Sequence, residues 1–150
     1  MDAETKAALV GQPIGYWAGE AYRRVSARLI ASLGEAGLSQ PQWWVLGRVE
    51  DSARSWTRDE LINELQPYSD VEEGRALAAE LDELADRAAV RVVDERLVIT
   101  PTGSELLEAA RANNGAAHRA MRSQLSDDEY AAMIDGLQKI VGALDAGRDS

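Results

Sequence analysis

Apolar residues recur at helical spacing along most of this chain, and the pattern predicts a mainly α-helical protein. One apolar stripe runs through residues 70–88. A second runs through residues 126–146 with an alternating three-and-four rhythm that suits packing against a partner helix. The first consists of Val71, Leu77, Leu81, Leu84 and Ala88, and the second of Tyr130, Met133, Ile134, Leu137, Ile140, Val141 and Leu144. With the capping signals, the pattern predicts helices over residues 14–34, 40–51, 57–65, 70–88, 102–123 and 126–146.

The predicted helix starts coincide with Ser/Thr-x-x-Glu/Gln capping boxes. In such a box the hydroxyl accepts a hydrogen bond from a free backbone N–H of the first turn, and the acid or amide reaches back to the cap. The five boxes pair Ser39 with Gln42, Thr57 with Glu60, Ser69 with Glu72, Thr102 with Glu105, and Ser126 with Glu129. Pro41 falls just inside its helix, where the missing N–H of proline costs nothing.

One stretch departs from helical spacing and predicts a short β-hairpin. Residues 90–93 and 97–99 are apolar-rich and flank the polar turn 94–96. A short helix, a turn around Pro67, a longer helix and a hairpin together form a winged helix-turn-helix over residues 57–103. The flanking helices, 14–55 and 104–146, are too apolar and Ala-rich to stand alone. We therefore expect one domain over residues 1–150 whose flanking helices intertwine with those of a second subunit.

Four ordered segments resemble the MarR family of bacterial transcriptional regulators. They are LSQPQWWVL at 38–46, TRDEL at 57–61, DER at 94–96 and ITPTG at 99–103, with Leu77, Leu81, Leu84, Ala89 and Val90 in the places of the recognition helix and the first wing strand. The resemblance spans residues 14–146. It implies a homodimer built on terminal helices, two winged helices that read double-stranded DNA at an inverted repeat, and a pocket for a small effector.

Three features depart from the family pattern. Residues 73–80, EGRALAAE, replace a polar and basic run, which leaves Arg75 as the residue able to donate to a base edge. The wing is short, with three residues between Arg96 and Thr100. Ala88 replaces the glycine usual before the wing.

The charge distribution opposes the expected DNA contact. The net charge is −10, and residues 56–103 carry five Arg against twelve acids, a net of −7. Acids in the first turn of a recognition helix favour the helix dipole but repel phosphate. Arg58, Arg75, Arg91 and Arg96 are nevertheless candidates for one DNA-facing strip. Arg75 would act in the major groove, Arg58 on the phosphate backbone, and Arg96 on the backbone or in the minor groove. The alternative is that the acids cap a helix and the arginines are solvated.

Aromatic residues and the lone histidine suggest an apolar effector pocket. The candidates are Trp17, Tyr22, Trp43, Trp44 and His118. Neighbours on a helix point about 100° apart, so we expect one of the adjacent tryptophans in the core and the other at a cleft or the dimer interface. Ordinary packing is the alternative for the aromatic residues, and an interface or surface position is the alternative for His118.

Several classes are disfavoured. The chain has no Cys and one His, which leaves no disulfide, thiolate metal site or multi-histidine site. No catalytic or nucleotide-binding motif is present, so we expect neither an enzyme nor a cofactor or metal. No apolar run approaches the roughly 20 residues of a membrane span, and the acidic N-terminus is unlike a signal peptide. We therefore expect a cytoplasmic protein without a membrane partner.

Two hypotheses follow. The first is a MarR-like homodimeric transcription regulator that binds DNA and is released by a small apolar effector. The second is a dimer of the same fold that no longer reads DNA and instead binds a ligand or a protein, as an anti-regulator would.

Overall fold

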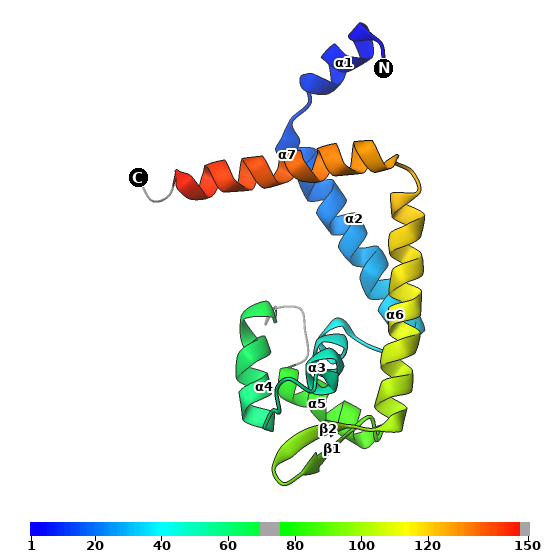
Figure 1. Ribbon diagram of the computed structural model, residues 1–150, viewed down its shortest axis with the longest axis vertical. Helices are drawn as coiled ribbons and strands as arrows, with labels where there is room; N and C mark the ends of the chain where they lie inside the picture. The colour runs from blue at the N-terminus through cyan, green and yellow to red at the C-terminus, as the bar shows by residue number, and fades with distance from the viewer. Residues whose placement is uncertain (70–75, 148–150) are drawn as a thin grey trace. The chain divides into compact units, whose positions relative to one another are not determined.

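A computed structural model of the chain describes residues 1–69 and 76–147 (Figure 1). The chain divides into two compact units, Met1–Asn114 and Gly115–Ser150, and each is described by itself. Helix α6 (Pro101–Arg122) crosses the boundary. The other elements of the first unit are α1 (Ala3–Val10), α2 (Ile14–Glu35), α3 (Gln40–Glu50), α4 (Arg58–Leu65), the 3-10 turn η1 (Gln66–Tyr68), α5 (Leu77–Asp86), β1 (Val90–Val93) and β2 (Arg96–Ile99). The second unit also holds α7 (Asp127–Ala146). The mainly α fold with a short hairpin wing is confirmed.

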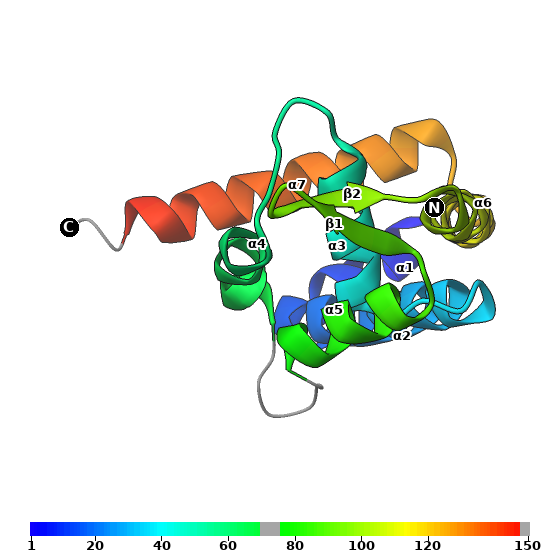
Figure 2. The ribbon, with the colours of Figure 1, turned by 90° about the horizontal axis from the view of Figure 1, so that it is seen from below.

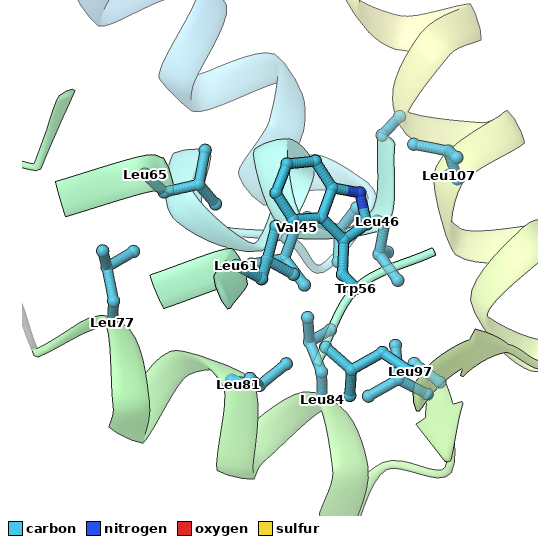
Figure 3. Close-up of a cluster of buried hydrophobic side chains, with 14 of the residues drawn as sticks. Val45, Leu46, Trp56, Leu61, Leu65, Leu77, Leu81, Leu84, Leu97 and Leu107 are labelled. Carbon is cyan, nitrogen blue, oxygen red and sulfur yellow. The ribbon is translucent and has the colours of Figure 1, made fainter. Parts of the chain in front are cut away.

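One apolar core unites α3, α4, α5, the hairpin and the start of α6 (Figure 3). Its members include Val45, Leu46, Trp56, Leu61, Leu65, Leu77, Leu81, Leu84, Leu97 and Leu107. Burying a leucine contributes about 1.5–3 kcal/mol, so this core holds the winged helix together. The sequence grouped α3 with the dimerisation helices of 14–55. Its buried face instead makes it part of the winged-helix core, and Figure 2 shows α3, α4 and α5 grouped around the hairpin.

Three of the predicted capping boxes are confirmed, at Ser39, Thr57 and Ser126. The box predicted at Thr102 is wrong, because α6 begins at Pro101 and Thr100 is the residue that caps it. The Thr100 Oγ1 accepts from the Gly103 N–H at 3.1 Å. Proline suits the first helical position, and this sets the cap one residue earlier. Glu72 of the Ser69 box lies outside the described residues.

One predicted helix is described only in part, and one observed helix was not predicted. The helix predicted over residues 70–88 begins at Leu77 in the described part, after an extended Ala76 (φ −54°, ψ 139°), and ends at Asp86. The buried face of α5 begins at Leu77, and residues 70–75 of the predicted helix lie outside the described residues. Helix α1 was not expected because all its residues are exposed and it has no apolar stripe. Its start is capped by Asp2, whose carboxylate accepts from the Thr5 N–H at 2.8 Å.

The wing is a tight antiparallel hairpin. Val90 pairs with Ile99 and Val93 with Arg96, so the loop consists of Asp94 and Glu95 alone. Both loop residues have positive φ, 49° and 64°, as a type I′ turn requires. Arg96, expected in the turn, is the first residue of β2.

The wing is fastened to the segment before α4. Thr57 forms an isolated bridge with Arg96. The Leu97 N–H donates to the Trp56 carbonyl at 2.8 Å. The segment before α4 therefore pairs with β2 at one bridge and does not form a third strand.

The junction between α5, the wing and α6 explains two residues noted in the sequence. Ala88 has φ 57° and completes a Schellman motif, in which the Ala89 N–H donates to the Leu84 carbonyl at 2.8 Å. Glycine is favoured at such a position. Gly103 lies so close to β1 that an added Cβ would stand 2.1 Å from the Ala89 carbonyl oxygen. In the ITPTG segment, Thr100 therefore caps α6, and Gly103 allows the helix to approach the Ala89 backbone more closely than any residue with a Cβ would permit.

In the second unit, α7 presents an apolar face that the single chain does not bury. Every residue of this fully described helix is exposed or half-buried. The large exposed side chains are Met133, Leu137, Ile140, Val141 and Leu144. At the start of α7, Arg122 pairs with Asp127 at 2.7 Å and lies over the Tyr130 ring. In the described ranges, 1–69 and 76–147, no helix is both long and apolar enough to cross a membrane.

Candidate nucleic-acid interface

Helix α5, which stands in the place of the expected recognition helix, offers little for reading bases. Residues 77–86 read LAAELDELAD and contain no side chain that donates a hydrogen bond when its acids are ionised. Leu77, Leu81 and Leu84 face the core, and Asp82 and Asp86 are exposed. The predicted base reader, Arg75, lies outside the described residues.

Arg58 is the first residue of α4 and lies along α5. Its Nη1 is 2.8 Å from Oδ1 of Asp82. Its Nη2 donates to the carbonyl of Ala78 at 3.0 Å. Ala78 and Asp82 are one turn apart on the same face of α5, so the guanidinium spans that turn and joins the two helices.

Arg96 turns from the wing onto α4. Its Nη1 is 2.9 Å from Oε2 of Glu60 and 3.4 Å from the Ser55 carbonyl oxygen. The same Glu60 oxygen accepts from the Thr57 N–H at 2.9 Å, so one carboxylate closes the capping box and holds the wing arginine. The Thr57 N–H lowers the pKa of Glu60 below its ordinary value, and the charges of Arg96 and Arg54 lower it further. Glu60 is therefore ionised at neutral pH.

The remaining predicted arginine of the wing is solvent-facing. Arg91 is exposed on β1, and its side chain has no hydrogen bond or ion pair with the rest of the described chain. Beside it, the tip carries the exposed acids Asp94 and Glu95. The wing therefore presents a cation on its strand and two anions at its end.

Three polar residues make contacts here that the sequence did not predict. Arg54 stacks on the buried Trp56, with its guanidinium carbon 3.6 Å from the ring centroid. Glu80 is 6% exposed and accepts from the Ser39 Oγ at 3.1 Å. Asp82 pairs with Arg58 across two helices. Glu80 and Asp82 contact segments that are distant in the sequence, and no local spacing signals these contacts.

The aromatic residues proposed for an effector pocket lie in separate places. Trp17 and Tyr22 are exposed on α2, at 54% and 75%. Trp17 is roughly 24 Å along the helix axis from Leu33, where α2 joins the core. Trp43 and Trp44 are both half-buried against the core, which differs from the expectation that one would be core and the other not.

The structure adds one aromatic neighbour to this set. The Trp44 ring meets the Tyr68 ring edge-on, with centroids 6.4 Å apart. His118 is exposed on α6, in the second unit. Within the first unit, the structure thus places Trp44 against Tyr68 and leaves Trp17 and Tyr22 of α2 apart from them. Among the residues that the structure describes, no group of three or more His, Asp or Glu could hold a metal ion.

Comparisons with solved structures identify this arrangement. No model of a known protein family and no curated protein matches the chain. MepR, a transcription regulator of the Staphylococcus aureus multidrug efflux pump MepA, is similar with a TM-score of 0.72 and 20% identity, over 89% of this chain and 99% of that chain. The Mycobacterium tuberculosis MarR family protein Rv2887 has a TM-score of 0.67 and 22% identity, over 85% and 93%. The reduced form of Escherichia coli MarR has a TM-score of 0.63 and 24% identity, over 86% and 93%. The predicted MarR-like winged-helix fold is confirmed.

Proposed function

We propose that this chain is a homodimeric, MarR-type transcription regulator that binds double-stranded DNA at an inverted repeat. The observation that carries the proposal is the winged-helix fold shared along 85% or more of the chain with MarR family structures. One of those proteins, Rv2887, is also solved in complex with DNA. We assign the chain no catalytic activity or cofactor and place it in the cytoplasm.

The exposed apolar face of α7 supports the dimer. Leu137, Ile140 and Leu144 are 40–66% exposed at helical spacing. A contiguous apolar stripe on a helix indicates a covered interface, and a second copy of this chain is the partner that the fold suggests. Light scattering at micromolar concentration tests the assignment, and a species of the monomer mass, 16.3 kDa, would refute it.

Phosphate contacts dominate the proposed DNA recognition. Arg58 lies beside α5, Arg96 lies on the wing, and Arg91 faces solvent on the wing. Arg75, in front of α5 in the sequence, is proposed to read a base edge or a phosphate in the major groove. Few base-reading donors and several phosphate-binding arginines give modest sequence specificity and a strong dependence on salt.

A small apolar effector is proposed to release the DNA. Rv2887 is also solved in complex with p-aminosalicylic acid. The candidate contacts in this chain are Trp17, Tyr22, Trp43, Trp44 and His118. Because Trp17 and Tyr22 lie far along α2 from the α3 tryptophans, we propose that the two groups serve separate contacts unless the second subunit joins them.

Fluorescence anisotropy with the DNA upstream of its own gene tests the regulator hypothesis. We expect binding that weakens steeply as salt rises from about 50 to 200 mM, and a weaker complex for Arg91→Ala. Glu108→Gln on α6 serves as a control that leaves the winged helix unaltered. An affinity that is the same with and without Arg91 would contradict the assignment of that residue.

A second candidate function has its own support. Arg58 and Arg96 are both held in ion pairs, and the wing tip is acidic. These observations favour a dimer that has lost DNA reading and binds a ligand or a protein with a basic surface. A titration without DNA binding at low salt, with a stoichiometric protein partner recovered from the host, would favour this candidate over the regulator.

A further inference from the structure

Two arginines of the proposed DNA face are each engaged by an acid of the same winged helix. Asp82 on α5 holds Arg58 at 2.8 Å, and Glu60 on α4 holds Arg96 at 2.9 Å. Both contacts join different elements of the fold. The arginines are therefore positioned by these acids, and each contact uses N–H donors that a phosphate would also use.

The ion pairs are open to competition by solvent and by other anions. The side chains of Arg58 and Arg96 are 40% and 46% exposed, and those of Asp82 and Glu60 are 64% and 44% exposed. Exposed pairs of this kind are weak and are screened by salt. A phosphodiester carries the same net charge as a carboxylate and accepts hydrogen bonds from the same guanidinium donors, so it can replace a carboxylate there.

We propose that Asp82 and Glu60 are internal competitors of the DNA phosphates, and that they hold the DNA affinity of this protein low. This inference rests on the proposed function. Each phosphate contact made by Arg58 or Arg96 requires an intramolecular pair to open, and the released carboxylate then lies close to the DNA backbone. The gain from each contact is reduced, and so is the net release of counterions.

The neighbouring acid Asp86 separates competition from general repulsion. It is exposed one turn after Asp82 on the same helix and has no ion pair with the described residues. Asp86→Asn therefore removes the same charge as Asp82→Asn without releasing an arginine. Glu60→Gln provides a second, independent test, because the glutamine can still accept from the Thr57 N–H and keep the capping box.

The experiment measures the affinity of the full-length protein for a labelled mixed-sequence duplex of about 30 base pairs, long enough for two half-sites. Because two subunits contribute, we expect Asp82→Asn and Glu60→Gln each to tighten binding by about fivefold, against less than about twofold for Asp86→Asn. The salt dependence should steepen by about one phosphate contact per subunit. Adding Arg58→Gln to Asp82→Asn should abolish the gain, while the Glu60→Gln gain should persist with Arg58→Gln.

The outcomes distinguish a failure of the proposed competition from a failure of the proposed function. Equal affinities for Asp82→Asn and Asp86→Asn, or an Asp82→Asn gain that survives Arg58→Gln, would overturn the competition and leave the regulator hypothesis standing. An absence of DNA binding by every variant at low salt would overturn the proposed function and the competition with it. Thermal melts of each variant establish that the compared proteins are folded.

Discussion

Replacing Gly103 by alanine should damage the junction between the wing and α6. A Cβ at this position would stand 2.1 Å from the Ala89 carbonyl oxygen and 2.8 Å from the Cγ1 of Ile99. Ordinary contact begins at 3.4 Å, so residue 103 and Ala89 would have to separate by about 1.3 Å to reach it. The nearer neighbour is backbone, and no side-chain rotation relieves the overlap.

The magnitude combines three effects. Overpacking of this kind costs about 3 kcal/mol when backbone must move. The movement also weakens the cap from the Gly103 N–H to Thr100, worth about 1 kcal/mol. Alanine returns about 1 kcal/mol because it is the better helix former. The net loss is about 3 kcal/mol, or a midpoint of thermal unfolding roughly 6–12 °C lower.

Urea unfolding followed by tryptophan fluorescence at one fixed protein concentration measures this loss. Gly47→Ala in α3 is the matched control, because no atom lies within 4 Å of its added Cβ. We expect the control to gain about 0.5–1 kcal/mol. Equal stability of Gly103→Ala and the wild type would refute the proposed close approach.

Three further changes test other contacts. Ala88→Gly should raise the free energy of unfolding by about 1 kcal/mol in the same assay, because Ala88 has φ 57°, which glycine adopts without strain. A lower free energy of unfolding would show that the packing of the methyl group outweighs the backbone strain. The two oxygens of Glu50 accept from Arg111, which joins α3 to α6 and raises the pKa of that arginine. Glu50→Gln should weaken this contact and lower the free energy of unfolding by less than about 1 kcal/mol, and high salt should remove the difference. Backbone and side-chain hydrogen bonds from Ser126 lower the pKa of Glu129 below 4.5, so their stabilisation is complete above pH 4.5 and is lost as the pH falls through the lowered value. Thermal melts between about pH 3 and 7 should therefore show a shallower acid decline for Ser126→Ala, and an unchanged decline would contradict the capping role.

Local chemistry made most of the fold predictable. The boxes at Ser39, Thr57 and Ser126 were readable because a capping box is complete within four residues. The start of α6 was misplaced because two threonines flank Pro101, and the proline decides which of them caps. Helix α1 escaped prediction because it packs nothing against the core, so its sequence carries no apolar period.

The candidate interface was less predictable than the fold. Arg58 and Arg96 lie on α4 and on the wing, as the sequence predicts, but the acids that pair with them come from other segments of the chain. A count of charges gave −7 for residues 56–103 without showing which acids neutralise which arginines. The fold shows that Asp82 pairs with Arg58 and Glu60 with Arg96, and it brings together partners that are distant in the sequence.

Ser39 links α3, which carries two tryptophans, to α5 of the winged helix. Its Oγ accepts from the Gln42 N–H at 3.2 Å, as the cap of α3, and donates to the buried Glu80 of α5 at 3.1 Å. A displacement of α3 that broke this bond would leave a nearly buried carboxylate unpartnered, which is costly. Ser39 therefore couples the tryptophan-bearing helix α3 to α5, and we expect a molecule that displaces α3 through Trp43 or Trp44 to displace α5 as well.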